Sequence, residues 1–194
     1  CVDALARVQR YTSGASAGEL QSVSVVPINV AREKTEGFDV ALNSRFGIGD
    51  AGDLAIGASY TYVIDHKIQQ YPGDPTLDKY VPLNGYEIPR DKGKAYVTWS
   101  LPRFSTTLTG IRIGKMTNWN WDGKLDESYW FNLSAQYDLT DRLRLSGTIN
   151  NLFDRDPVAD PTHASYPYYN RSWFDSIGRR FYLQLTYKIG GEPL

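Results

Sequence analysis

The chain has 194 residues, and its 21 Lys and Arg side chains nearly balance its 22 Asp and Glu side chains, leaving a net charge of −1. Proteins that bind nucleic acid usually carry an excess of positive charge, which this chain lacks, so we expect no nucleic-acid partner. A membrane helix needs about 20 successive apolar residues, and the chain has no such stretch. These figures exclude a helical membrane protein but leave open a membrane β-barrel, whose strands alternate apolar and polar residues.

Apolar and polar residues alternate with a period of two in seven segments, which predicts seven β-strands. The segments are 35–46, 54–64, 95–101, 107–113, 129–138, 143–150 and 181–188. One face of these strands is expected to be uncharged, with Leu42, Ile56, Leu133 and Leu183 among its members. Such a face suits either a protein core or lipid. The pattern predicts an all-β antiparallel meander.

The fourth segment has the weakest alternation. We assign Ile111 and Ile113 to one face, which leaves Leu108, Gly110 and Arg112 on the other. On this assignment Arg112 belongs to the polar wall, and no charged side chain falls on the apolar face of any strand.

Short and long connections alternate along the chain. The short connections are 47–53, 102–103 and 139–142, and the long ones are 65–92, 114–128 and 154–178. Every tight turn should therefore lie at one end of the sheet and every long loop at the other, as in outer-membrane barrels. A soluble β-sandwich has less reason to separate them, although functional loops can cluster at one end.

Aromatic residues make up 13% of the chain, including 14 Tyr and 5 Trp. They gather near both strand ends, as bilayer interfaces favour; the members are Trp99, Phe104, Tyr137 and Tyr187 near the short turns, and Tyr60, Tyr62, Tyr129 and Phe181 near the long loops. The alternative explanation is that aromatic residues have a high strand propensity.

Seven strands in a meander cannot close into a barrel, because the first and last strands run in the same direction. Bacterial single-chain barrels have even strand numbers. The count therefore suggests a piece of a larger sheet.

Two motifs lie near the C-terminal end of the sequence. The first is Leu-Thr-Asp-Arg-Leu at 139–143, followed by Ile-Asn-Asn-Leu-Phe-Asp-Arg-Asp-Pro at 149–157. The second is Asp-Ser-Ile-Gly-Arg-Arg-Phe-Tyr-Leu-Gln-Leu-Thr-Tyr-Lys-Ile at 175–189. They resemble the penultimate and final strands of TonB-dependent outer-membrane receptors. Glu-Gly-Phe-Asp at 36–39 is similar to a strand opening common in the same family.

The resemblance implies a 22-stranded transmembrane β-barrel that contains a plug domain. This chain would supply about the last seven strands, with the plug absent. The implied division is an external loop segment at 1–32, barrel at 33–189 and a short C-terminal tail at 190–194. Family members commonly end on an aromatic residue, whereas here five residues follow Ile189.

The resemblance also implies a function. These receptors sit in the bacterial outer membrane and import scarce, bulky nutrients such as ferric siderophores, with energy from the TonB complex. The implied partners are outer-membrane lipid, the plug domain, the TonB complex and a small-molecule ligand, with no cofactor and no enzymatic activity. Cys1 resembles the second cysteine of an external-loop disulfide whose partner would lie upstream of this chain. An ordinary free thiol is the alternative.

Two sets of residues are candidates for a site. Exposed loop aromatics could stack on a bulky planar ligand, or they could pack the loops together; they are Trp119, Trp121, Tyr166, Tyr168, Tyr169 and Trp173. Polar strand residues would face the plug across the lumen; they are Arg45, Arg112, Gln136, Arg144 and Gln184. We expect no metal site, because His66 and His163 lie in different loops without a ligand motif.

Two other functions are compatible with the pattern. The first is a soluble β-sandwich that binds carbohydrate through aromatic loops. The second is a passive porin-like barrel. No catalytic arrangement of side chains stands out in the sequence.

Overall fold

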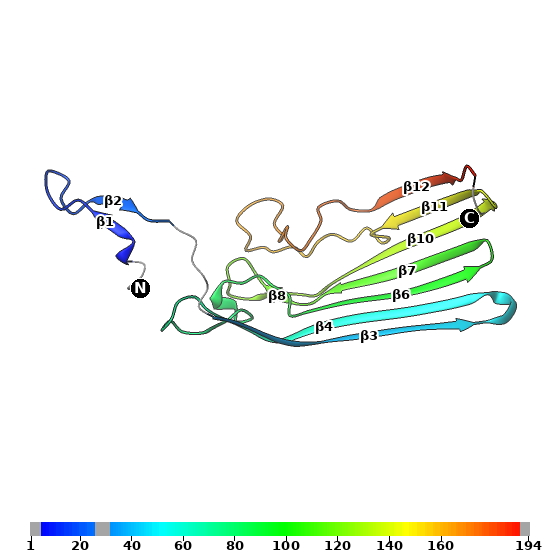
Figure 1. Cartoon of the computed structure of the whole chain (residues 1–194), viewed down its shortest axis with the longest axis horizontal. Coiled ribbons are helices and arrows are strands. Elements are labelled where there is room, and N and C mark those ends of the chain that lie inside the picture. Colours follow the sequence, from blue (N-terminus) through cyan, green and yellow to red (C-terminus); the bar gives the residue numbers. More distant parts are fainter. Residues whose placement is uncertain (1–4, 26–31, 191–194) are drawn as a thin grey trace.

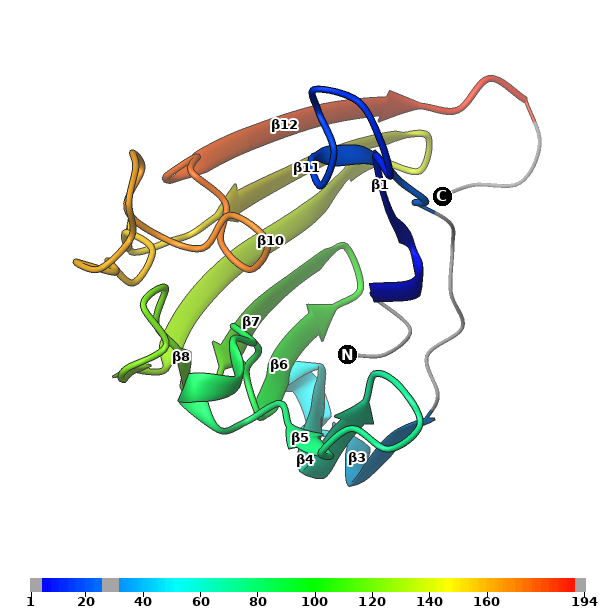
Figure 2. The same cartoon turned by 90° about the vertical axis from the view of Figure 1, so that its left-hand side faces the viewer.

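This computed structural model describes residues 5–25 and 32–190. Seven long antiparallel strands form one sheet in chain order (Figure 1); they are β3 (Arg32–Gly47), β4 (Asp53–Gln69), β6 (Asp91–Leu101), β7 (Phe104–Ile113), β10 (Ser128–Thr140), β11 (Leu143–Asn150) and β12 (Arg180–Tyr187). Each strand pairs with its neighbours in the chain, which confirms the predicted all-β meander. Figure 2 shows that the sheet is strongly curved, as the wall of a barrel is.

Several short elements lie outside these strands. They are β1 (Val8–Arg10), β2 (Leu20–Val23), β5 (Leu77–Asp78), β8 (Met116–Thr117), β9 (Lys124–Leu125) and the 3-10 turns η1 (Gly49–Ala51) and η2 (Pro82–Asn84). β1 pairs with β2, β8 with β9, and β5 adds to β4. Within the described ranges, no helix has the length and apolar character needed to cross a membrane. Cys1 and residues 191–194 lie outside the described residues.

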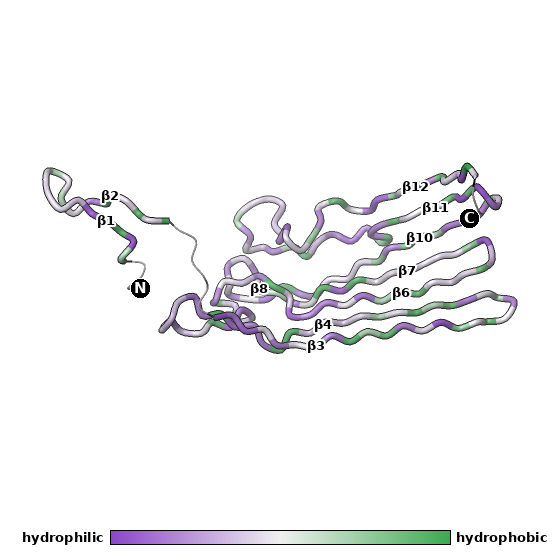
Figure 3. The backbone as a smooth tube through the Cα atoms, in the orientation of Figure 1, coloured by the Kyte–Doolittle hydropathy of each residue, from purple (hydrophilic) through white to green (hydrophobic). Residues whose placement is uncertain are grey.

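The register carries one apolar face across the whole sheet. It pairs Leu42 with Ala58, Ile56 with Val97 and Leu133 with Ile149 on neighbouring strands. Directly opposed residues point to the same side of a sheet, so these side chains form a continuous surface. Figure 3 shows hydrophilic and hydrophobic residues mixed along every long strand, with no long hydrophobic run.

That apolar face is exposed. Leu42 is 58% exposed and Leu183 is 79% exposed. The buried apolar side chains of the described residues all come from connections between the long strands; they are Tyr80, Met116, Leu125, Tyr169 and Phe174. A β-sandwich would bury its apolar face against a second sheet, and among the described residues no second sheet covers this one. Hydrocarbon is the solvent that suits such a surface.

Aromatic side chains flank the apolar face at both ends. Near the short turns, the rings of Trp99 and Phe104 meet edge to face at 5.8 Å. Near the long loops, the rings of Phe38 and Tyr62 stack at 5.6 Å. Two such belts are typical of the two interfaces of a bilayer.

Arg112 lies on the apolar face and not on the predicted polar wall. The register pairs it with Gly93 on β6 and Tyr129 on β10, both of which belong to the apolar face. The prediction was wrong because Ile111 and Ile113 set the phase of the alternation. These two isoleucines face the polar side, where they line a pocket.

Candidate ligand site

The second face of the sheet is polar over most of its height. Arg144 makes a two-pronged contact with Asp138, at 2.5 Å and 3.0 Å. Arg45 is 3.0 Å from Asp53. Gln136 and Gln184 lie on this face too, because the register opposes Gln136 to Ser146 and Ser146 to Gln184. Four of the five predicted lumen residues thus share this face, and Arg112 does not.

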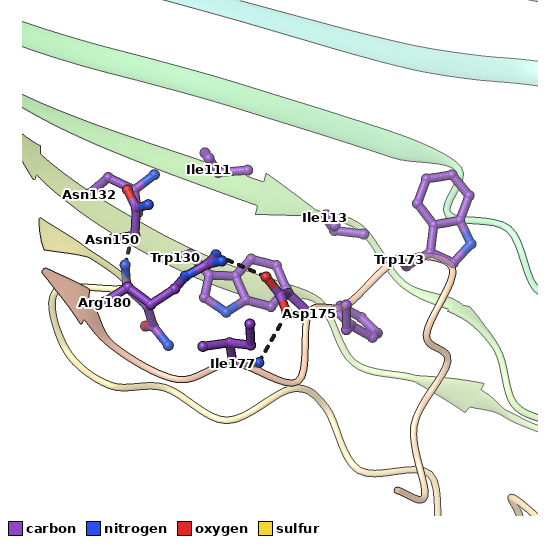
Figure 4. Close-up of a pocket in the computed structure, with 11 residues that line it drawn as sticks. Ile111, Ile113, Trp130, Asn132, Asn150, Trp173, Asp175, Ile177 and Arg180 are labelled. Carbon is purple, nitrogen blue, oxygen red and sulfur yellow. Dashed lines mark hydrogen bonds and ion pairs between the residues drawn. The ribbon is translucent and has the colours of Figure 1, made fainter. Parts of the chain in front are cut away.

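The polar face becomes apolar near the long-loop end, where it forms a pocket of about 320 Å³ (Figure 4). The floor comes from β7, β10 and β11, through Ile111, Ile113, Trp130, Asn132 and Asn150. The wall comes from the connection between β11 and β12, including Trp173, Phe174 and Ile177. Ligand sites commonly combine an apolar lining with a few placed polar groups.

The β11–β12 connection is held against the sheet by hydrogen bonds at its start. The backbone amide of Leu152 donates to the carbonyl oxygen of Phe131 at 2.7 Å. The amide of Asn151 donates to the side-chain oxygen of Asn132 at 2.9 Å. Asn151 adopts a positive φ of 53°, a region that Asn tolerates better than most residues. The connection therefore leaves β11 in a fixed direction over the pocket.

Apolar packing fixes the middle of the same connection. Met116 and Leu125, from the β8–β9 hairpin, form a buried cluster with Tyr169 and Phe174. The ring of Phe174 lies 5.4 Å from that of Trp130 on the floor. Burying such a ring contributes roughly 1.5–3 kcal/mol. The two loops and the sheet therefore form one packed unit.

A buried carboxylate joins the two loops. Asp160 is 1% exposed. Its Oδ2 accepts a hydrogen bond from the backbone amide of Trp119 at 2.7 Å. Its Oδ1 accepts from the amide and the hydroxyl of Thr162, at 2.9 Å and 2.6 Å. Sequence reasoning missed this residue, because its partner in the other loop, Trp119, lies 41 positions away in the chain.

The polar groups of the pocket converge on one cation. Arg180 forms an ion pair with Asp175 at 2.9 Å, drawn in Figure 4. The same carboxylate accepts the backbone amide of Ile177 at 3.0 Å. The Nε of Arg180 is buried and has no hydrogen-bond partner among the described residues. A guanidinium with spare donors can bind oxygen-rich anionic groups.

Trp173 is the predicted loop aromatic that reaches the pocket. Its indole N–H donates to the carbonyl of Glu87 at 2.9 Å, and the ammonium of Lys92 lies 4.3 Å from its ring. Lys92 belongs to β6, and Glu87 lies in the connection between β4 and β6. They hold the indole in place at the edge of the pocket.

The other predicted aromatics lie elsewhere. Tyr169 is 8% exposed and packs within the loops. The ring of Trp119 is tilted against that of His163 at 4.5 Å, and Tyr166 and Tyr168 meet edge to face at 6.2 Å. Trp121 lies with a positive φ of 59° and is half-exposed. Sequence reasoning missed Trp130, although three aromatic residues in succession at 129–131 signal that both faces of β10 are apolar there.

A curved antiparallel sheet with an exposed apolar face, two aromatic belts and a polar face is the wall of a transmembrane β-barrel. The chain belongs to the TonB dependent receptor-like, beta-barrel family, whose profile matches residues 3–152. This is a family of outer-membrane receptors and transporters.

Solved structures with the same fold include ferric enterobactin receptors. A mutant of the ferric enterobactin receptor from Pseudomonas aeruginosa aligns over 93% of this chain and 25% of its own, with 20% identity and a TM-score of 0.58. A second mutant, in complex with enterobactin, aligns over 93% and 26%, with 19% identity and a TM-score of 0.58. The siderophore receptor PiuA from Acinetobacter baumannii aligns over 63% and 18%, with 21% identity and a TM-score of 0.45. The search of curated proteins finds no match. The chain spans about a quarter of the enterobactin receptors it resembles.

Proposed function

We propose that this chain is part of an outer-membrane receptor that imports a scarce, bulky nutrient, such as a ferric siderophore, with energy from the TonB complex. The observation that carries the proposal is a two-sided sheet: its apolar face is exposed, and a pocket with a cation opens on the opposite face. In a closed barrel that opposite face lines the lumen, so the pocket would lie on the path of an entering ligand.

The pocket suits a flat, oxygen-rich ligand. Trp130 and Trp173 offer ring faces for stacking, and Arg180 offers donors to anionic oxygens. The solved complex with enterobactin supports a small-molecule ligand for a receptor of this fold. Exposed Trp119, Trp121, Tyr166 and Tyr168 would make first contact outside the pocket, whereas Tyr169 would support the loops from within.

The other parts of the chain would have structural roles in the same receptor. Arg45, Gln136, Arg144 and Gln184 would face a plug domain through hydrogen bonds and ion pairs. The division into an external segment at 1–32, barrel at 33–189 and tail at 190–194 belongs to the same proposal. So does the pairing of Cys1 with a cysteine upstream of this chain.

The exposed apolar face disfavours a soluble carbohydrate-binding sandwich, since such a face would aggregate in water. A passive porin-like barrel would need no pocket built from packed loops. This pocket also favours a function in binding and transport over one in catalysis.

The test uses the complete receptor that contains this chain. Arg180→Ala should weaken binding of a ferric catecholate siderophore by about tenfold or more, since a hydrogen bond to a charged group contributes roughly 1.5–3 kcal/mol. Arg155→Ala, in the β11–β12 connection that leads to Arg180 but outside the pocket, is the matched control and should bind as wild type. Iron uptake should require TonB. Equal affinity of the two variants would refute the pocket assignment, and TonB-independent uptake would refute the transport mechanism.

A further inference from the structure

A second pocket, of about 380 Å³, lies at the long-loop end of the sheet. Tyr62, Asp91 and Arg112 line it. Tyr62 and Asp91 are register partners, and Arg112 is the partner of Tyr129. All three belong to the apolar face, so this part of the lining lies on the side of the sheet opposite to the Arg180 pocket.

The register also fixes the height of this pocket. Tyr62 stacks on Phe38 in the aromatic belt near the long loops, and Arg112 donates a hydrogen bond to the hydroxyl of Tyr129 at 3.1 Å. Aromatic belts lie at the level of lipid headgroups. The pocket therefore lies where a bilayer changes from hydrocarbon to charged headgroups.

Cations outnumber carboxylates in the lining. Four cationic side chains face it, against two carboxylates; they are Arg90, Arg112, Lys115 and Lys124, with Asp91 and Glu127. Arg112 is ion-paired with Asp91. Lys115 contacts Asp126 at 2.9 Å and Glu127 at 3.7 Å. The guanidinium of Arg90 lies 4.4 Å from the ring of Tyr80.

We propose that this pocket binds the phosphate of a membrane-lipid headgroup. A cationic pocket at the headgroup level attracts anionic lipid. The aromatic rings below it continue into the apolar face, so a lipid could keep its chains on that face while its phosphate meets the cations. A free phosphate ion would gain nothing from this apolar neighbour. The proposal rests on the membrane placement of the sheet but not on the identity of the imported nutrient.

The test is native mass spectrometry of the complete receptor, equilibrated in detergent with equimolar phosphatidic acid and phosphatidylcholine. Bound phosphatidic acid should exceed bound phosphatidylcholine. Lys115→Gln/Lys124→Gln should lower this ratio by roughly fivefold or more, given the attraction of each surface lysine to anionic lipid. Glu127→Gln, which removes an opposing charge, should raise it. Lys94→Gln/Lys188→Gln removes the same charge away from the pocket and should leave the ratio unchanged.

Three results would overturn the proposal that this pocket binds a lipid phosphate. No preference for phosphatidic acid in the wild type would overturn the proposal, as would equal loss in the two lysine double variants. Competition by inorganic phosphate without any lipid preference would assign the pocket to the free ion and also overturn it. Siderophore binding by the same preparations reports on the Arg180 pocket alone, so failure of one assignment is distinguishable from failure of the other.

Discussion

The carboxylate of Asp160 accepts the backbone amide of Trp119 at 2.7 Å, across 41 positions in the chain. Asp160→Ala would leave that amide without its charged acceptor, at a cost of roughly 1.5–3 kcal/mol. We expect both loops to become more susceptible to proteolysis in the complete receptor, with weaker ligand binding. Asp156→Ala, exposed in the same connection, is the control. Equal protection of the two variants would show that Asp160 does not join the loops.

The two faces of β12 should respond oppositely to charge. Leu183→Arg places a cation on the exposed apolar face, which costs about 2–4 kcal/mol at the middle of a bilayer. Gln184→Arg places the same cation on the polar face and should be tolerated. Heat-modifiable gel mobility of the receptor in outer-membrane fractions measures the folded amount of each. Similar loss in both variants would contradict the assignment of the faces.

Gly57 allows two side chains on the polar face to approach each other. A Cβ at this position would lie 2.6 Å from the Oδ1 of Asn43 and closer still to the ring of Tyr96. Tyr96 donates a hydrogen bond to that same oxygen at 3.1 Å. Gly57→Ala should therefore destabilise the barrel by about 1–3 kcal/mol, as overpacking does.

Gly47→Ala serves as the control for this substitution, because its Cβ would come no closer than 3.7 Å to any neighbour. Denaturant unfolding of the refolded receptor compares the two. A smaller loss at Gly57 than at Gly47 would refute the predicted crowding.

Tyr80 should make the connection between β4 and β6 sensitive to alkali. Burial raises the pKa of its hydroxyl above the usual value near 10, against the opposing effect of Arg90. Because the folded pKa is the higher one, the stabilisation is complete below about pH 10 and is lost as the pH rises through the folded pKa.

We expect hydrogen exchange in residues 70–90 to accelerate, as the pH rises above about 10, beyond its intrinsic pH dependence. Tyr80→Phe should remove this excess, and Tyr71→Phe, in the same connection, should keep it. An unchanged profile in Tyr80→Phe would exclude the phenol as its source.

The sequence predicted the seven strands and their order because alternation is a local signal that the sheet preserves. It failed at β7, where Ile111 and Ile113 face the polar side to line a pocket. There the inner surface is itself apolar, so hydropathy alone cannot tell the two faces apart, and Arg112 was assigned to the wrong one. The short β8–β9 hairpin was missed because two-residue strands carry no period.

The candidate site was less predictable than the sheet. Trp173 was foreseen as a loop aromatic, but its place depends on the carbonyl of Glu87, which lies 86 positions away. Arg180 is the first residue of β12, and nothing in the neighbouring sequence indicates that it lines a pocket. Its position follows from the path of the β11–β12 connection, which tertiary packing determines and composition does not.

β3 and β12 form the two outer margins of the seven-stranded path. Within the described residues, each of these two strands pairs on one side with a long neighbour, leaving the backbone N–H and C=O groups of its other side to be matched. An unmatched amide or carbonyl in hydrocarbon costs several kcal/mol. Further strands must therefore pair with β3 and β12 before this sheet is stable in a bilayer. Membrane insertion must be coupled to closure of the barrel.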